Sequence, residues 1–278
     1  MSGRADGSAA PADGPADDYT VDELMVCVLA ACFQDGDQVL NGLSSFIPVC
    51  AIKLARRTHA PDLVWIAGGS GVSPRSPRLT ASTFEWPLWR DSVMYVDVAT
   101  ELWDWVADER LLRTFCAGAA QIDAHGNANN SVIGSFDRPR VRLPGTAGLG
   151  DMGSLSKRIV YWVADHSPRT LVERVDFRSA AGYLGGGGER ARLGLGGGPE
   201  LVVTNLAVLD FAPVSERMRL RSVHPGVTVE QVLAATGFEP VLPAEVAATA
   251  VPTVRQVDLI RRVIDPEGYR RRGFRSPA

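Results

Sequence analysis

The sequence has no long hydrophobic run, and apolar residues nowhere approach the ~20 in succession that a helix needs to cross a bilayer. Its first residues are mostly Ser, Gly, Ala, Asp and Pro, without the apolar core of a secretion signal. We therefore expect the protein to stay in the cytoplasm.

Positive charge is not in excess either, because 29 Lys and Arg oppose 32 Asp and Glu and give a formal net charge of -3. This balance argues against bulk attraction to nucleic acid or to an anionic membrane. Arg138, Arg140 and Arg142 could form a local anion site, although a solvated basic loop is the favoured interpretation.

Cysteine is scarce, and the four that occur, Cys27, Cys32, Cys50 and Cys116, do not have the spacing of metal ligands. Each lies in apolar surroundings, which predicts small buried hydrophobic residues instead of disulfides. We expect no metal site and no tightly bound cofactor.

Hydrophobic residues make up 45% of the 278 residues and charged residues 22%, ordinary values for a soluble protein with a core. Residues 1–18 are of low complexity and are predicted to be disordered. Strand and helix patterns then alternate without a repeat, so residues 19–278 are predicted to form a single α/β domain.

The capping boxes Thr20/Glu23 and Thr228/Gln231 start two of the predicted helices. The predicted helices are 24–33, 47–57, 229–235 and 254–264, and the predicted strands are 38–40, 63–67, 112–117, 158–163, 170–175, 201–204, 207–211 and 219–223.

A glycine-rich corner follows one of the predicted strands. Residues 63–67 are all apolar, which indicates a short strand buried on both faces, and they lead directly into glycine at 68. Open α/β sheets bind ligands beyond the carboxyl ends of their strands. We therefore take Gly69, Ser70 and Gly71 as candidate ligand-site residues. A second segment, 182–198, contains nine glycines and is predicted to be a flexible surface loop, with a lid over a bound substrate as the alternative.

Two further segments carry candidate ligand-site residues. Asp123 and Asn127 enclose a glycine and predict a rigid turn, for which a structural and a substrate-contacting role are both open. Gln121 is the better functional candidate, because its amide both donates and accepts hydrogen bonds at a strand end. The loop that contains Gly145, Ala147 and Gly148 offers exposed backbone amides suited to a phosphate or an oxyanion.

The histidines and tryptophans are assigned mainly structural roles. His59, His166 and His224 are predicted to be hydrogen-bonded turn residues and not catalytic bases. Most of the aromatic cluster formed by Trp86, Trp89, Trp103 and Trp105 is predicted to lie in the core or in a subunit interface, where large aromatic side chains dominate burial. A pocket for an apolar acyl group is the alternative.

Five further segments, residues 54–61, 118–129, 143–148, 203–211 and 222–228, occur in an order that is informative as a set. In this order they resemble the β subunits of class I (glutaconate-type) CoA-transferases, and in particular the actinobacterial branch that contains a steroid-ring-cleaving hydrolase. The similarity extends from about residue 22 to residue 265. The resemblance implies the CoA-transferase (NagB/RpiA-like) fold, an open mostly parallel sheet flanked by helices. It also implies a coenzyme A thioester as substrate and an α subunit of the same fold as partner, in an α2β2 heterotetramer.

One feature of the transferases is missing. In that family a glutamate within a Glu-Ser-Gly triplet follows the buried strand, attacks the thioester, and passes through an acyl anhydride to an enzyme–CoA thioester. This chain has Gly69-Ser70-Gly71 at the matching place, and Gly69 has no side chain that could attack. Ser70 has no evident histidine base beside it in the sequence, and the spacing of Glu85 does not require it to take over the role.

Three hypotheses follow. In the first, the enzyme hydrolyses an acyl-CoA or cleaves a carbon–carbon bond in it, as the steroid-ring-cleaving branch does, and a carboxylate of the α subunit activates water as a general base. In the second, the complex is a true CoA-transferase whose glutamate comes from the partner or from another position. In the third, the chain is a non-catalytic scaffold. The missing glutamate favours the first and third hypotheses, and the retained glycine loops favour the first over the third.

Overall fold

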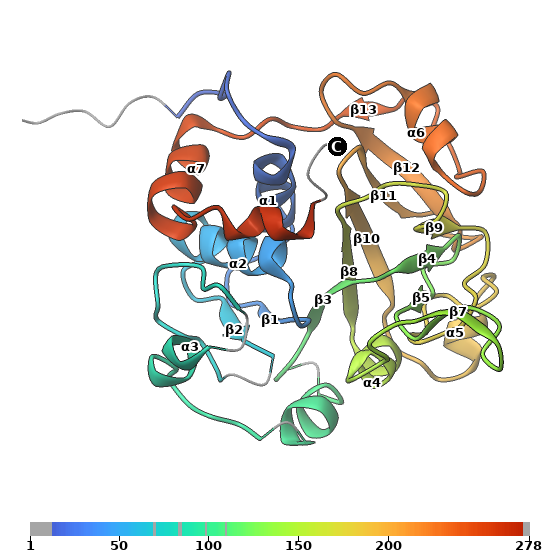
Figure 1. Ribbon diagram of the computed structural model, residues 1–278, viewed down its shortest axis with the longest axis horizontal. Coiled ribbons are helices and arrows are strands. Elements are labelled where there is room, and N and C mark those ends of the chain that lie inside the picture. The colour runs from blue at the N-terminus through green and yellow to red at the C-terminus, as the bar shows by residue number, and fades with distance from the viewer. Residues whose placement is uncertain (1–12, 69–70, 83–84, 98, 109, 275–278) are drawn as a thin grey trace, which may run out of the picture.

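The centre of the molecule is an eight-stranded sheet with the strand order β13-β12-β11-β10-β8-β3-β1-β2 (Figure 1). The computed structural model describes residues 13–68, 71–82, 85–97, 99–108 and 110–274. Five neighbouring pairs of strands are parallel, and only β10–β11 and β11–β12 are antiparallel. The strands are β1 (Gln38–Asn41), β2 (Val64–Ile66), β3 (Thr114–Gly118), β8 (Arg158–Val163), β10 (Pro199–Thr204), β11 (Ala207–Phe211), β12 (Met218–Val223) and β13 (Ala247–Ala248). The predicted open, mostly parallel sheet is confirmed.

Helices cover one face of this sheet. They are α1 (Val21–Ala31), α2 (Phe46–Thr58) and α7 (Val254–Asp258), which continues as the π-helical segment η2 (Leu259–Ile264) (Figure 1). Side chains alternate between the faces of a strand, and Cys116, Val160 and Val203 belong to the core on the helical side. The strands are therefore buried on this face by helix packing.

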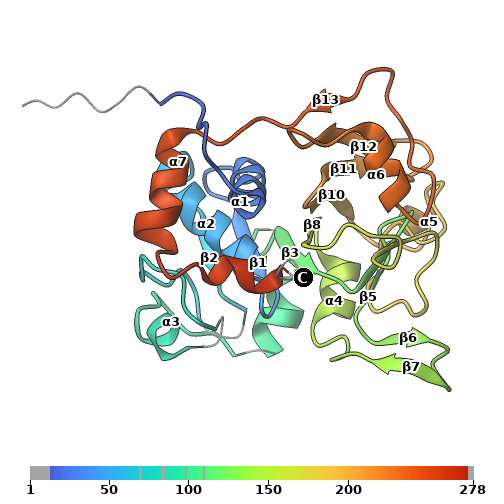
Figure 2. The same cartoon turned by 45° about the horizontal axis from the view of Figure 1, so that its top comes forward.

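A second layer covers the opposite face, toward which Phe115 and Ile159 point. It consists of α4 (Leu149–Leu155), α6 (Val229–Ala235) and a small sheet of β5 (Ala128–Asn129), β4 (Gln121–Asp123) and β9 (Leu171–Val172). The remaining elements are α3 (Trp86–Arg90), η1 (Thr100–Trp105), α5 (Glu189–Arg192), η3 (Tyr269–Gly273) and the hairpin β6 (Val132–Gly134) and β7 (Pro139–Arg142), which projects from the body in Figure 2. No helix in the described ranges is long and apolar enough to cross a membrane.

The β2 strand forms one end of the large sheet, with β1 as its only strand neighbour. The chain turns back along its free side, because Val72 forms an antiparallel bridge with Ile66 and a second one with Met94. The unpaired backbone groups of an edge strand can hydrogen-bond to a strand of another chain, and this returning segment covers that edge of β2. The glycine corner after β2 therefore lies at the margin of the sheet.

Local signals placed the helix starts correctly. The backbone N–H of Thr20 donates to the Glu23 carboxylate at 2.9 Å, and Thr228 and Gln231 form the predicted reciprocal pair of bonds at 2.8 and 3.2 Å. Each bond satisfies a backbone or side-chain group at a helix end that would otherwise lack a partner. A third capping box, at Thr253, was not predicted.

The amino-terminal extension differs from the expected disorder in residues 13–18, and residues 1–12 lie outside the described part. Ala16 is buried, and its N–H donates to the Pro252 carbonyl at 2.8 Å. Val254 in turn donates to the Gly14 carbonyl at 3.0 Å. A composition rule cannot foresee this pairing, because it depends on a segment more than two hundred residues further along the chain.

A buried ion cluster joins the carboxyl-terminal region to α1. The Arg270 guanidinium lies 2.6 Å from the Asp22 carboxylate, 2.7 Å from that of Glu23 and 3.0 Å from that of Asp265. All four side chains are buried. Arg270 thus pairs with three buried carboxylates, and Glu23 is also paired with Arg261 at 2.8 Å. Such a buried cluster is costly and depends on all partners being present.

Candidate functional site

The carboxyl ends of β1, β2 and β3 lie together at one edge of the sheet, because the three strands are parallel neighbours. The chain continues from β1 to β2 on one side and places β3 on the other, which makes the β1–β3 boundary a topological switch point. Ligands of open α/β sheets bind at such points. The Gly42 N–H donates to the Cys116 carbonyl at 2.8 Å there.

The corner after β2 is too crowded at its described positions for a side chain. A Cβ atom at Gly68 would lie 2.7 Å from the Asn41 carbonyl oxygen, and one at Gly71 would lie 2.3 Å from the Ser92 Oγ. Gly71 also has a φ of +134°, a conformation that favours glycine. The other two candidates, Gly69 and Ser70, lie outside the described residues, so their role stays a prediction.

The loop that contains Gly145, Ala147 and Gly148 lies at the end of β3. Asn130 places it there, because its carbonyl accepts from the Gly145 N–H at 2.8 Å and its side-chain amide donates to the Gly118 carbonyl at 3.0 Å. Ala147 has a φ of +42°, a left-handed conformation that costs about 1 kcal/mol for a residue with a side chain. Such strain is concentrated at ligand sites. Asn130 was missed in the sequence, since its contacts are long-range.

Gln121 is buried at the start of β4, and its side chain is mostly occupied by neighbours. Its Oε1 accepts from the Asn129 side-chain amide at 2.7 Å and from the Asp176 N–H at 3.1 Å. Its Nε2 donates to the Asp176 carboxylate at 3.2 Å. This leaves the second N–H of the amide without a partner among the described residues. Substrate contact through that N–H stays a prediction.

Asp123 and Asn127 form the rigid turn that the sequence predicted. The Asp123 carboxylate accepts from the Asn127 side-chain amide at 2.9 and 3.0 Å, and from the N–H groups of His125 and Asn127, each at 3.0 Å. Burial raises the pKa of Asp123, while these hydrogen bonds oppose the rise. The Asn127 Oδ1 also accepts from the Gly182 N–H at 2.9 Å. The turn thus fixes the start of the glycine-rich segment.

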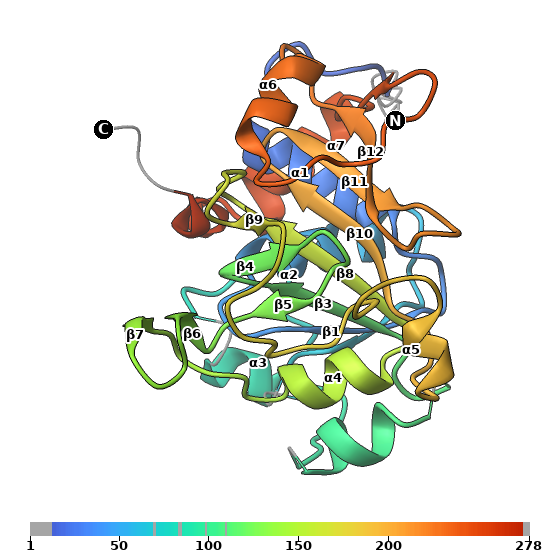
Figure 3. The same cartoon turned by 90° about the vertical axis from the view of Figure 1, so that its right-hand side faces the viewer.

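Arg190 organises the glycine-rich segment 182–198, for which a flexible loop was predicted. The guanidinium is buried and donates seven hydrogen bonds, of 2.7 to 3.2 Å, to backbone carbonyls. Four of the acceptors belong to the segment and its approach, and two, Gly153 and Ser154, belong to the last turn of α4. Figure 3 shows α5, which carries Arg190, beside α4. The segment is therefore tied to the helix that follows Gly148.

The histidines His166 and His224 have the predicted structural role. Nδ1 and Nε2 of His166 each lie 2.9 Å from a threonine hydroxyl, those of Thr204 and Thr236. Nε2 of His224 donates to the Thr204 carbonyl at 2.8 Å, and its Nδ1 lies 3.0 Å from the Thr249 hydroxyl. Burial lowers the pKa of His166 to about 4 and lowers the pKa of His224 as well. Neither is placed as a base at the carboxyl edge of β1–β3.

This network predicts an acid-sensitive fold. The unfolded chain binds a proton at His166 below about pH 6.5, whereas the folded protein does so only near about 4. The neutral His166 ring therefore makes its full contribution to the free energy of unfolding above about pH 6.5, and this contribution is lost as the pH falls toward about 4. We expect the free energy of unfolding to drop by about 1–2 kcal/mol between about pH 7 and pH 5 in urea titrations. The drop should be smaller in His166→Gln, and an equal drop in that variant contradicts the assignment.

The tryptophans correct one prediction. Trp86, Trp89 and Trp103 are 70%, 39% and 58% exposed, so a place in the core of this chain is wrong for them. Only Trp105 packs against the core, and only partly. Tyr95, on the same stretch of chain, is 58% exposed. We call Trp86, Trp89, Tyr95 and Trp103 the aromatic surface. The predicted subunit interface and the alternative pocket for an apolar acyl group both stay predictions for these residues.

The cysteines agree with the sequence prediction. All four are free, and three of them are buried. Burial raises the pKa of the Cys27 thiol to about 12 and that of Cys32 to about 11. Thiols with such values are not nucleophiles near neutral pH.

An open, mostly parallel sheet with two glycine loops at its carboxyl edge defines an α/β protein with a candidate ligand site at a switch point. The model of the coenzyme A transferase family matches residues 24–235, and the chain belongs to this family. The resemblance noted in the sequence is thereby confirmed.

Known relatives include proteins with different activities. The chain is 32% identical over 244 residues to one of the subunits of the 3-oxoadipate CoA-transferase of Pseudomonas knackmussii, covering 87% of this chain and 92% of the relative. It is 31% identical over 252 residues to the cholesterol ring-cleaving hydrolase IpdB subunit of Rhodococcus jostii, covering 90% and 94%.

Solved structures with a similar fold also include proteins with different activities. Glutaconate coenzyme A-transferase from Acidaminococcus fermentans superposes with a TM-score of 0.83 at 25% identity, over 94% of this chain and 99% of that one. The decarboxylase AibA/AibB superposes with a TM-score of 0.79 at 29% identity, over 92% and 99%. Proteins named as transferases, a hydrolase and a decarboxylase thus share this fold.

Proposed function

We propose that this chain is the β subunit of a heteromeric enzyme that hydrolyses an acyl-CoA or related thioester, or cleaves a carbon–carbon bond in it, with a catalytic carboxylate supplied by an α subunit. The observation that carries the proposal is the glycine corner after β2. No Asp or Glu occurs in residues 63–84, and Gly68 and Gly71 have no room for a side chain. A glutamyl nucleophile at this end of β2 is therefore not supported.

The chemistry assigned to this chain is the positioning of the thioester. A carboxylate of the α subunit takes a proton from water as the oxygen attacks the acyl carbon, and the coenzyme A thiolate leaves. Negative charge develops on the carbonyl oxygen during the attack, and backbone N–H groups are its usual stabilisers. In the strained loop, the Gly145 N–H already donates to the Asn130 carbonyl, so the N–H groups of Ala147 and Gly148 are the candidates for this role. Gln121 is the candidate side chain for holding the substrate.

A partner is supported by two observations. The relatives are named as single subunits of larger enzymes or as one member of a two-component pair, and the aromatic surface leaves large apolar side chains exposed. Large exposed apolar side chains are candidates for contact with another protein when they gather on one face. We therefore assign the aromatic surface to the contact with an α subunit of the same fold, in an α2β2 heterotetramer.

A second candidate function is transfer of CoA between carboxylic acids. The relatives named as 3-oxoadipate and glutaconate CoA-transferases favour it. It requires a glutamate from the partner or from a later position in this chain. Glu85, which precedes α3, is the first carboxylate after β2 in the sequence.

Trapping of the covalent intermediate separates the two functions. The assembled complex is incubated with acyl-CoA and treated with borohydride or hydroxylamine, and both subunits are mapped by mass spectrometry. We expect no modified glutamate on this chain and no inactivation by hydroxylamine. A modified Glu85 contradicts the proposal and supports the transferase. The isolated chain is expected to be inactive, and full activity without a partner contradicts the need for an α subunit.

Gln121→Ala tests the positioning role in the assembled complex. We expect turnover to fall at least about tenfold, equivalent to about 1.4 kcal/mol of transition-state stabilisation, with assembly preserved. The lost bonds to Asn129 and Asp176 are also expected to lower the free energy of unfolding by about 1–3 kcal/mol. Gln231→Ala, which removes only a helix cap on α6, is the control and should leave turnover unchanged. Unchanged turnover in Gln121→Ala favours the scaffold hypothesis instead.

A further inference from the structure

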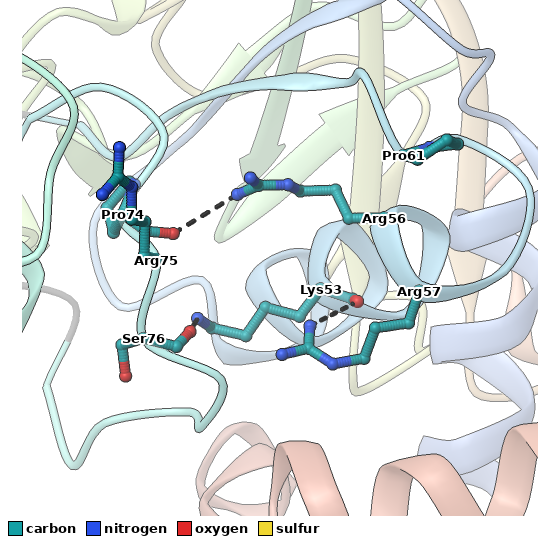
Figure 4. Close-up of a pocket in the computed structure, with 7 residues that line it drawn as sticks. All are labelled: Lys53, Arg56, Arg57, Pro61, Pro74, Arg75 and Ser76. Carbon is teal, nitrogen blue, oxygen red and sulfur yellow. Dashed lines mark hydrogen bonds between the residues drawn. The ribbon is translucent and has the colours of Figure 1, made fainter.

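Four cationic side chains surround a pocket between α2 and the chain that returns from the glycine corner. Lys53, Arg56 and Arg57 follow one another at helical spacing, so they share one face of α2. Arg75 lies across from them on the returning chain. The pocket has a volume of about 260 Å³, and its lining is completed by Pro61, Pro74 and Ser76 (Figure 4). The lining contains no carboxylate.

The cations of α2 reach the returning chain only through carbonyl groups. Lys53 Nζ donates to the Ser76 carbonyl at 2.7 Å and lies 4.6 Å from the centre of the Trp65 ring. Arg56 donates to the Pro74 carbonyl at 3.3 Å, and Figure 4 shows both side chains extended from the helix toward the loop. Arg57 donates to the Lys53 carbonyl at 3.0 Å. These contacts use some of the guanidinium N–H groups and neutralise none of the charge.

The positive charge in the pocket is therefore uncompensated. Burial, together with the charges of Arg57 and Arg56, lowers the pKa of Lys53 to about 7. Burial and the charge of Arg57 also lower the pKa of Arg56. Arg78, further along the same loop, differs because its charge is paired with the Glu267 carboxylate, 3.3 Å away. A bound anion would remove the repulsion within the pocket.

We infer that this pocket binds a phosphate group. Two guanidinium groups on α2 and a third across the opening match the charge and the several acceptor oxygens of a phosphate dianion. A bound anion would also favour the protonated form of Lys53. The site is separate from the carboxyl edge, because α2 ends next to the start of β2, whereas the glycine corner follows the end of β2. The inference does not depend on the proposed thioester chemistry. The phosphate is either free or the phosphate of a nucleotide.

Binding to the full-length chain tests the inference, with inorganic phosphate and adenosine 3′,5′-bisphosphate as probes in calorimetric titrations at constant ionic strength. We expect a dissociation constant below about 1 mM for at least one probe. Tighter binding of phosphate identifies a free phosphate, and tighter binding of the bisphosphate identifies a nucleotide. Failure of both probes to bind at about 5 mM overturns the inference.

Variants show whether binding occurs in the pocket. Arg56→Gln is expected to weaken binding at least about tenfold, but it also removes the bond to Pro74. Arg75→Gln avoids that complication, because the Arg75 side chain has no hydrogen bond to the described residues, and we expect a loss of about tenfold as well. Arg78→Gln removes the same charge next to the pocket and should change binding less than about twofold. Equal weakening by Arg75→Gln and Arg78→Gln indicates nonspecific attraction and overturns the inference.

Discussion

Replacing Arg190 with alanine is expected to lower the free energy of unfolding by about 4 kcal/mol, at the upper end of single-substitution effects. The guanidinium donates to six carbonyl groups, of which those of Gly153 and Gly182 are buried. Each buried group left without a donor costs about 1–3 kcal/mol before the segment relaxes. Equilibrium unfolding in urea gives the change directly. Limited proteolysis should also show cleavage within residues 182–198 in the variant before the rest of the chain is cut.

The effect should extend from this segment to the candidate site. Arg190 holds the last turn of α4 through Gly153 and Ser154, and the loop at Gly145 and Gly148 leads into the first turn of the same helix. A loosened α4 would displace that loop. We therefore expect the assembled complex of the variant, under conditions in which it is folded, to lose more turnover than its stability alone would explain.

Two comparisons keep this prediction specific. Arg192→Ala removes an exposed arginine of the same short helix with one hydrogen bond, to the Gly187 carbonyl, and should change stability by less than about 0.5 kcal/mol. Arg190→Lys keeps the charge but has fewer donors in a different geometry, so an intermediate loss is expected. A loss below about 1 kcal/mol for Arg190→Ala contradicts the central role of the guanidinium.

Arg270→Met is expected to lower the free energy of unfolding by about 3–5 kcal/mol in guanidinium chloride titrations, because it leaves the buried carboxylates of Asp22 and Asp265 without their buried cation. Asp22, Glu23 and Asp265 are 6%, 0% and 1% exposed. Burial alone would raise the pKa of Glu23, but hydrogen bonds from Arg261 and Thr20 and the charge of Arg270 outweigh burial and lower the pKa. The variant removes one of these opposing effects. Its deficit should therefore shrink in acid, where the carboxyl groups of both proteins are protonated.

The neighbouring arginine provides the matched control. Arg271 lies 3.7 Å from Asp22 but its side chain is 59% exposed, and exposed ion pairs contribute about 0–1 kcal/mol. Arg271→Met should therefore lower the free energy of unfolding by less than about 1 kcal/mol when both variants are unfolded in guanidinium chloride titrations. If the two variants lose equal stability, the buried cluster around Arg270 does not have the assigned energetic role.

The sequence predicted those parts of the fold that depend on neighbours along the chain. The apolar run at 158–163 is β8 at its predicted bounds, and the helix 229–235 begins at its predicted cap, Thr228. The predicted strand 170–175 is shorter, since only Leu171–Val172 pairs with β4 and the chain then turns so that Asp176 meets Gln121. The strands β4 to β7, of two to four residues, were not predicted as a group, because segments so short carry little periodicity.

The glycine loops of the candidate site could be predicted from the sequence, whereas the side chains that hold these loops in place could not. Glycines at 68–71 and 145–148 are visible in the sequence because loops after strands have a characteristic composition. Asn130 and Arg190 act through partners far along the chain, so no local pattern identifies them. The cations at 53, 56 and 57 resemble an ordinary solvated helix end until the returning chain is placed opposite them.

Because β2 is the last strand at one end of the large sheet, the corner that follows it has few strand neighbours. A substitution or a change of length at the corner after β2 affects one outer strand and the segment that covers it, whereas the same change after β3 would disturb strands on both sides. Changes at this corner should therefore disturb the rest of the sheet little, except at Gly68 and Gly71, which have no room for a side chain. Reactive groups can be gained or lost there over evolutionary time while the inherited scaffold, and its docking to a second protein of the same fold, persist. Directed evolution of a new activity would best begin by randomising positions 69 and 70, with Gly68 and Gly71 kept.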